Sequence, residues 1–270
     1  MQINAMRATT HNRHVITVIL VCLCCGVSVS HAETITIRAD EWYPVNGQPD
    51  SDRPGYMIEL ASTILAGHDY SVDYQTMPWE RAVDSVRKGK YDCVVGAFRG
   101  DTPDFVFPRE NWGRIATGFY TRAGNPWRYT GLNSLRTQTV GIIGGYAYGD
   151  ELDSFILQNG SLFHAIKGET ALENNIEKLL AGRISVIAEA PLVMNAKLKE
   201  LGLQEQVRPA GRLNEGEPVY IACSPAKPRS RQLVDWFDTG IRELRRSGTL
   251  AKILAKYAMT DWKAQTPANE

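Results

Sequence analysis

The chain has 270 residues, and its 30 basic and 30 acidic side chains give a formal net charge of zero at neutral pH. The first 32 residues carry Arg7 and Arg13 and no acid, so the remainder has 28 basic against 30 acidic residues, a charge of −2. This balance gives no reason to expect a nucleic acid or an anionic membrane surface as a partner.

The amino terminus has the pattern of a secretory signal peptide. A basic region that includes Arg7 and Arg13 precedes an apolar stretch at 15–29, which is shorter than a comfortable membrane span of about 20 residues. Ser30-His31-Ala32 then places small residues at the spacing that a signal peptidase reads. We expect cleavage of residues 1–32 after Ala32 and a periplasmic mature protein; an uncleaved membrane anchor is the alternative.

The first half of the mature chain alternates between patterns typical of strands and of helices. Strands are indicated by alternation at period two or by short apolar runs, and helices by apolar residues three and four apart. The expected order is a strand at 34–39, a helix at 56–66, a strand at 71–77, a helix at 79–88 and a strand at 91–98. This β-α-β-α-β order predicts a mostly parallel α/β sheet.

The order then restarts. The expected elements are a strand at 139–143, helices at 149–157 and 174–181, a strand at 184–188, a strand at 218–223 and helical structure over 231–258. We interpret these as a first lobe (33–121), a second lobe (122–218), a return to the first lobe (219–262) and a tail (263–270). Two such α/β lobes leave a cleft between them where strand ends form ligand sites, with a hinge near 121–122 and 217–219.

Signatures of catalysis and of metal binding are missing. Beyond the signal peptide the histidines are His68 and His164, which lack metal-ligand spacing. The chain has no G-x-S-x-G and no Walker A motif, and the glycine-rich stretch 141–149 does not match the dinucleotide pattern. We therefore expect no catalytic residues, no metal and no cofactor. Cys93 and Cys223 can form a disulfide or remain as two buried thiols.

Four clusters are candidates for a binding site, and each has a structural alternative. Trp42 and Tyr43 follow the first strand and can wall a pocket or simply pack at the strand exit. Trp79, just after Pro78, stands at a helix start beside the cleft or in the core. The turn 144–149 offers backbone N–H groups to an anion or is a plain tight turn. Glu189 can pair with an ammonium group or be a solvated loop acid.

These pieces together resemble a known family. The motifs are W-Y-P-V, G-Y-M-I-E-L, P-W-E-R-A, G-K-Y-D-C-V-V-G, V-G-I-I-G-G-Y-A-Y-G, L-L-A-G-R-I and R-S-G-T-L-A-K-I-L-A-K-Y. In this order they are similar to the family 3 extracytoplasmic solute-binding proteins, the polar amino-acid receptors of ABC importers. The resemblance implies an α/β two-lobed clamshell of the type II periplasmic binding proteins, with each mostly parallel sheet flanked by helices.

The resemblance also implies which residues bind the solute. Trp42 or Tyr43 and Trp79 would wall it from the first lobe. The strand exit would contribute Gly96, Ala97 and Arg99. From the second lobe, Tyr146 and Ala147 lie where the family offers a turn to the ligand carboxylate, and Glu189 lies near the family's ammonium-binding aspartate, one residue short in spacing.

One departure from the family concerns the loop after the strand at 91–98. Amino-acid receptors of the family carry T-x-x-R there, and the arginine clamps the ligand α-carboxylate. This chain has Thr102-Pro103-Asp104-Phe105, so the arginine is absent and Asp104 stands roughly at its place. Arg99 could restore the positive charge, with Arg81 and Arg109 as further candidates; the alternative is that Arg99 faces solvent.

The expected function is that of a secreted periplasmic receptor, not an enzyme, which captures a small polar solute and delivers it to the permease of an ABC transporter. We expect a monomer that binds no nucleic acid. The alternatives are a ligand-sensing subunit for a membrane receptor, and a cyclohexadienyl-dehydratase-like enzyme with Glu189 as general acid.

Overall fold

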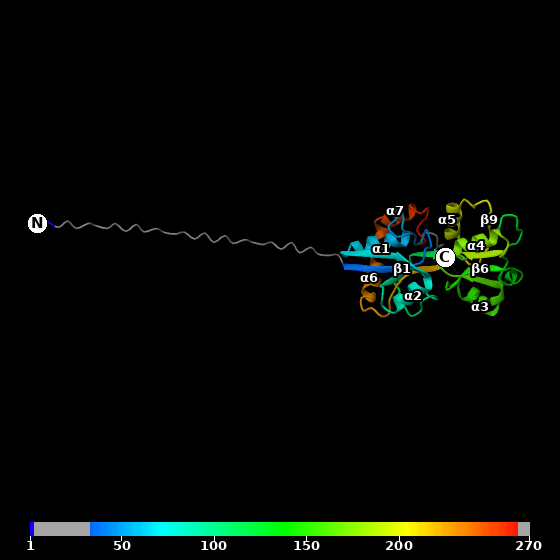
Figure 1. Cartoon of the computed structure of the whole chain (residues 1–270), viewed down its shortest axis with the longest axis horizontal. Coiled ribbons are helices and arrows are strands. Elements are labelled where there is room, and N and C mark those ends of the chain that lie inside the picture. Colours follow the sequence, from blue (N-terminus) through cyan, green and yellow to red (C-terminus); the bar gives the residue numbers. More distant parts are fainter. Residues whose placement is uncertain (3–32, 264–270) are drawn as a thin grey trace, which may run out of the picture. The chain divides into compact units, whose positions relative to one another are not determined.

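The computed structural model describes residues 1–2 and 33–263 (Figure 1). The expected signal peptide, with its cleavage site, and the tail beyond residue 263 fall outside the described residues. Within the described range, none of the helices combines the length and the apolar character that a membrane crossing needs.

The first lobe is built on a five-stranded mixed sheet. Its strands, in spatial order, are β2 (Tyr70–Thr76), β1 (Glu33–Ala39), β3 (Cys93–Ala97), β10 (Glu217–Cys223) and β4 (Gly113–Ile115). β10 is antiparallel to both of its neighbours, so the other four strands share one direction. The expected mostly parallel sheet is confirmed.

Alternating side chains of these strands pack into two apolar clusters, one on each face of the sheet. Cys93 and Val95 belong to the cluster with α1 (Tyr56–Ala66), α6 (Ser230–Arg246) and α7 (Thr249–Ala255). Val94 points the other way, into a cluster with α2 (Trp79–Arg87). Figure 1 shows α1 and α7 on one side of the first sheet and α2 on the other.

The second lobe repeats this plan. Its strands are ordered β7 (Phe163–Ile166), β6 (Val140–Ile143), β8 (Val186–Glu189), β5 (Gly118–Arg122) and β9 (Val207–Arg212), and β5 is the antiparallel member. The helices are α3 (Asp150–Gln158), α4 (Ala171–Leu180) and α5 (Pro191–Leu201), with 3-10 turns at Leu132–Thr137 and Gly160–Leu162. Figure 1 shows α4 and α5 on one side of this sheet and α3 on the other.

The chain crosses between the sheets twice. The first crossing lies between Ile115 and Gly118, and the second between Arg212 and Glu217. Each crossing ends in the antiparallel strand of the sheet that it enters. The expected lobe boundaries, after residues 121 and 218, therefore fall inside β5 and β10. Hydrophobic patterns locate strands but do not indicate which sheet a strand joins, which accounts for the offset.

A disulfide between Cys93 and Cys223 joins β3 to β10. Both cysteines are fully buried. The bond ties the returning strand to the sheet built by the first part of the chain, across a sequence separation of 130 residues. Of the two alternatives that the sequence left open, the structure has the disulfide.

Candidate functional site

Strand ends from both sheets converge on two adjoining pockets between the lobes. Asp40, Trp42 and Tyr146 line both of them. The aromatic pocket is further lined by Trp79, Gly96, Phe98, Asp101 and Ala147. The acidic pocket is further lined by Tyr43, by the basic residue Lys197 and by the acids Glu41, Glu169, Glu173, Glu189 and Glu200.

The aromatic pocket owes its shape to local sequence. Pro78 precedes the first residue of α2, so Trp79 lies in the first helical turn and is buried at the pocket wall. Gly96 has φ +78°, and a Cβ there would lie 3.3 Å from the Trp42 ring. Trp42 meets Phe98 and Tyr146 edge-on, with ring centroids 6.3 and 6.2 Å apart. Tightly packed aromatic rings therefore form much of the wall.

Hydrogen bonds between the lobes pass directly through both pockets. Trp42 donates its indole N–H to Oε1 of Glu189 over 2.9 Å. The amide N–H of Ala147 is donated to Oδ1 of Asp101, also over 2.9 Å. Tyr146 donates its hydroxyl to Asp40. The structure is thus a closed form in which residues of the two lobes bind one another across the cleft.

Three of the carboxyl groups in the pockets have strongly raised pKa values. Burial raises the pKa of Asp40 to about 6, and that of Asp101 to about 7. Burial likewise raises the pKa of Glu189 to about 7, although its hydrogen bond from Trp42 acts in the opposite direction. Because burial in the closed cleft removes these carboxyl groups from solvent, their charged forms are disfavoured.

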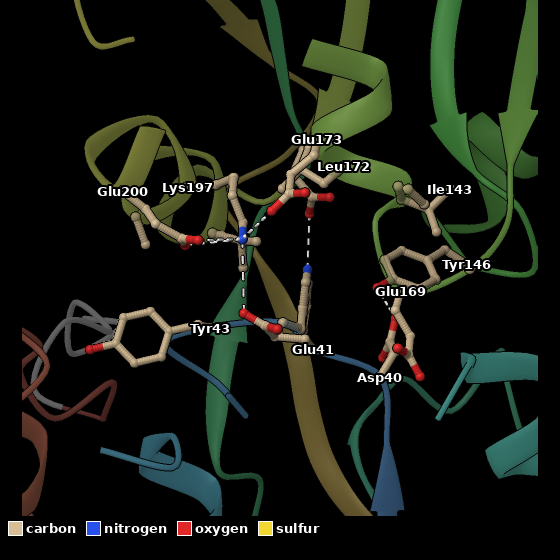
Figure 2. Close-up of a pocket in the computed structure, with 16 residues that line it drawn as sticks. Asp40, Glu41, Tyr43, Ile143, Tyr146, Glu169, Leu172, Glu173, Lys197 and Glu200 are labelled. Carbon is tan, nitrogen blue, oxygen red and sulfur yellow. Dashed lines mark hydrogen bonds and ion pairs between the residues drawn. The ribbon is translucent and has the colours of Figure 1, made fainter. Parts of the chain in front are cut away.

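Lys197 extends from α5 into the acidic pocket, as Figure 2 shows. Its ammonium group lies 3.1 Å from Glu173 and 3.0 Å from Glu200 in the second lobe, and 3.8 Å from Glu41 in the first. Its side chain is only 13% exposed. Burial acts to lower the pKa of Lys197, but hydrogen bonds to Glu200 and Glu173 raise it overall. The ammonium group of Lys197 is therefore already paired with carboxylates of both lobes.

The structure brings most of the predicted site residues together. Those that line a pocket are Trp42, Tyr43, Trp79, Gly96, Tyr146, Ala147 and Glu189. Glu189 is 3% exposed, which rules out the alternative of a solvated loop acid. Ala97 lines neither pocket and is buried in the apolar cluster under α2.

Arg99 does not join the other predicted site residues. Its guanidinium group lies 4.7 Å from the ring centroids of both Phe107 and Tyr220. It also donates a hydrogen bond to the carbonyl of Pro108 over 3.2 Å. Arg99, like Arg81 and Arg109, is absent from the lining of both pockets. The predicted replacement of the family's arginine clamp by Arg99 has no counterpart in this closed form.

The loop at 102–105 is also turned away from the pockets. Asp104 forms a surface ion pair with Arg87, with a nitrogen–oxygen distance of 2.8 Å. Phe105 is buried in the cluster under α2. The carboxylate that enters the site is instead Asp101, which sequence reasoning missed. The available signal was an aspartate between the end of β3 and the Thr-Pro turn, a position from which a short side chain can reach free backbone N–H groups.

Asp40 and Lys197 were missed as well. Asp40 directly follows β1 and precedes Trp42, so its place at a strand end was a usable signal. Lys197 lies in the interior of a helix on which no expectation had been placed, and its position in the pocket depends on how that helix packs.

Known proteins share this architecture. The family model of the bacterial extracellular solute-binding proteins, family 3, matches residues 35–260. No curated protein matches the chain. A solved histidine kinase sensor domain with similarity to periplasmic binding proteins has a TM-score of 0.69 at 19% identity, covering 84% of this chain and 96% of its own.

Two further structures show the same fold. An ancestral arginine-binding protein bound to arginine has a TM-score of 0.70 at 18% identity, covering 84% of this chain and 99% of its own. An amino acid ABC transporter substrate-binding protein from Streptococcus pneumoniae bound to L-arginine has a TM-score of 0.68 at 19% identity, covering 84% and 94%.

At such identities the solved structures establish the fold, and the family model, which spans nearly all of the described lobes, establishes the family. Both agree with the two mixed sheets and with the cleft between them. The chain belongs to the bacterial extracellular solute-binding proteins of family 3.

Proposed function

We propose that this protein is a periplasmic receptor that closes its two lobes on a small polar solute and presents the closed form to the permease of an ABC importer. The observation that carries the proposal is the cleft itself. Trp42, Tyr146 and Ala147 line its pockets and also make the hydrogen bonds that join the lobes. Groups that bridge the lobes directly without a solute can bridge them through one when it is bound.

Several observations support the periplasmic assignment. The described part of the chain contains a disulfide, Cys93–Cys223, and disulfides persist in oxidising compartments such as the bacterial periplasm. The amino-terminal sequence has the features of a signal peptide. The similar S. pneumoniae protein is the substrate-binding component of an amino acid ABC transporter. We expect the mature receptor to act as a monomer.

The test is a thermal-shift screen of the mature protein, followed by titration calorimetry. The panel contains amino acids, dicarboxylates, polyamines and small peptides. A ligand at a hundred times its dissociation constant adds about 2.7 kcal/mol to the free energy of unfolding, which raises the melting temperature by several degrees. A panel without any shift contradicts solute capture.

A sensing role is the second candidate, favoured by the likeness to a histidine kinase sensor domain. A strain that lacks the protein separates the two roles once a solute has been found. Loss of uptake of the labelled solute supports import. Unchanged uptake together with loss of a transcriptional response to the solute supports sensing.

An enzymatic role is favoured by one property, the pKa of Glu189, which burial raises to about 7. A carboxyl group that is protonated near neutral pH can act as a general acid. Incubation with prephenate or arogenate tests this role directly. Formation of an aromatic product supports a dehydratase, whereas reversible binding without turnover supports a receptor.

A further inference from the structure

Acidic side chains far outnumber basic ones in the lining of the two pockets. Seven acidic side chains line them, namely Asp40, Glu41, Asp101, Glu169, Glu173, Glu189 and Glu200. The lining includes one basic side chain, Lys197, which is already paired with carboxylates of both lobes. A solute carboxylate entering this cleft would therefore meet like charges and find no unpaired cation among the lining residues.

Two backbone donors that could bind a solute carboxylate, the N–H groups of Ala147 and Phe98, are occupied by the chain itself. Asp101 accepts the amide N–H of Ala147 from the second lobe and that of Phe98 from the first, each over 2.9 Å. The carboxylate of Asp101 thus sits at the turn after β6, where the resemblance to amino-acid receptors placed the ligand carboxylate. Asp101 thus already uses the N–H groups of Phe98 and Ala147, and a solute carboxylate at the same place would find neither of these donors free.

The remaining surface of the aromatic pocket suits a positive charge. Trp42, Trp79, Phe98 and Tyr146 supply aromatic rings, whose faces attract ammonium and guanidinium groups. Asp40 lies among these rings and lines the acidic pocket too. A solute with a cation at each end could place one end beside Asp40 and Asp101 and the other beside Glu41 and Glu173.

We propose that the cleft binds a linear organic dication without a carboxylate, such as a diamine, a guanidino-amine or a polyamine. This inference rests on the proposed solute-capture function and names its ligand class. The dication is organic because, within residues 33–263, no group of three or more His, Cys, Asp or Glu side chains is placed to hold a metal ion. The aromatic walls also suit a solute with an alkyl chain better than a bare ion.

The experiment compares solutes that differ in one group. Cadaverine and lysine differ only by the α-carboxylate, as do agmatine and arginine; pentylamine keeps the chain of cadaverine but lacks its second charge. Affinities for the mature wild-type protein are measured by titration calorimetry at pH 8. We expect cadaverine to bind at least about tenfold more tightly than lysine and pentylamine, and agmatine at least about tenfold more tightly than arginine.

The outcomes separate this inference from the function on which it rests. If lysine or arginine binds as tightly as its decarboxylated partner, the ligand class is wrong while solute capture stands. The same holds if only neutral or anionic members of the wider panel bind. If neither the matched compounds nor any member of the wider panel binds, solute capture itself fails.

A matched pair of variants tests the role of Asp101. Asp101→Ala removes the internal carboxylate and frees the N–H groups of Phe98 and Ala147, so the preference for cadaverine over lysine should fall at least about tenfold. Asp104→Ala lies in the same loop, but its carboxylate pairs with Arg87 at the surface, so the preference should persist. An unchanged preference in Asp101→Ala overturns the assignment of Asp101. The wild-type comparison stands even if this variant fails to fold.

Discussion

Trp42 and Glu189 join the two lobes by a hydrogen bond from the indole N–H to Oε1 over 2.9 Å. Their positions are 147 residues apart in the sequence, and both side chains are less than a tenth exposed. The same carboxylate oxygen accepts the amide N–H of Ala190 over 2.7 Å. Glu189 is therefore held by one donor from each lobe, and among the described residues it forms no ion pair.

The substitution Glu189→Gln tests what this charge contributes. Glutamine keeps an oxygen acceptor for Trp42 and Ala190 but loses the negative charge, so affinity for an organic dication should fall by about 1.5–3 kcal/mol, the value of a hydrogen bond to a charged group. The melting temperature should stay the same or rise, because a buried neutral group costs less than a buried charge.

Calorimetric titration and thermal melting measure the two effects of Glu189→Gln. Glu205→Gln is the control, since Glu205 is an exposed acid that lines neither pocket. If Glu189→Gln binds the dication as tightly as the wild-type protein does, the carboxylate of Glu189 does not take part in binding the cation.

The stability of the protein without solute should decrease as the pH rises from about 4 to about 7. Burial raises the pKa of Asp40 to about 6, and the pKa values of Asp101 and Glu189 to about 7. Between the ordinary values, 3.8 for Asp and 4.5 for Glu, and these raised values, the folded state holds protons that the unfolded state has released. Each such proton lowers the free energy of unfolding by up to about 1.4 kcal/mol per pH unit.

Urea unfolding across this pH range measures the slope. The slope for Glu189→Gln should be shallower, because one of the titrating groups is gone. A bound dication favours the charged carboxylates, so the thermal shift that it causes should grow from pH 5 to pH 8. A shift that is constant or shrinks over this range argues against pairing between the ligand and these groups.

Reduction of the Cys93–Cys223 disulfide should destabilise the first lobe. The bond closes a loop with a sequence separation of 130 residues, and removal of a native disulfide typically costs about 2–5 kcal/mol. The measurement is urea unfolding of the mature protein with and without reductant. The double variant Cys93→Ser/Cys223→Ser should match the reduced protein and show no response to reductant. Equal stability of oxidised and reduced wild type would contradict the structural role.

Arg99→Ala should lower stability but leave solute affinity unchanged. Arg99 lies over Phe107 and Tyr220 and bonds to the Pro108 carbonyl, and a cation–π contact contributes about 0.5–2 kcal/mol. Thermal melting and calorimetry with the same solute measure the two quantities. A loss of affinity with unchanged stability would show that Arg99 takes part in solute binding, as the family resemblance implied.

Much of the fold could be predicted from the sequence because its elements carry strong local signals. Helix α2, for example, begins directly after Pro78 and ends just before Lys88-Gly89, and central strands such as β3 are continuous apolar runs. Two of the missed strands lack such signals: β9 contains Pro209 and Gly211 and lies at a sheet edge, where both are tolerated. β7 is another edge strand, of only four residues, none of them buried.

The site could be predicted only where a residue type and its place at a strand end coincide. Trp42, Tyr146 and Glu189 meet both conditions and line the pockets. Arg99 meets both conditions as well, since it follows the exit of β3 and carries a charge, but its packing against aromatic rings decides its position instead. Asp101 was overlooked because its role depends on the N–H of Ala147, a contact between residues 46 apart in the sequence that no local pattern indicates.

Lys197→Gln should strengthen the binding of an organic dication. The ammonium group of Lys197 is paired with the carboxylates of Glu41, Glu173 and Glu200. Removal of the ammonium group leaves these carboxylates free to pair with a positively charged end of the solute. Loss of one cation from this group should improve affinity by about 1 kcal/mol or more and lower the stability of the protein without solute, since unpaired like charges repel one another.

The control for Lys197→Gln is Lys199→Gln, an exposed position on the same helix that lines neither pocket; it changes the net charge equally. Calorimetry at two salt concentrations compares the variants, because a general charge effect is screened by salt more than a buried one. Weaker binding in Lys197→Gln would mean that Lys197 contacts the solute or orders the pocket for it, and that the acidic pocket receives an anionic group.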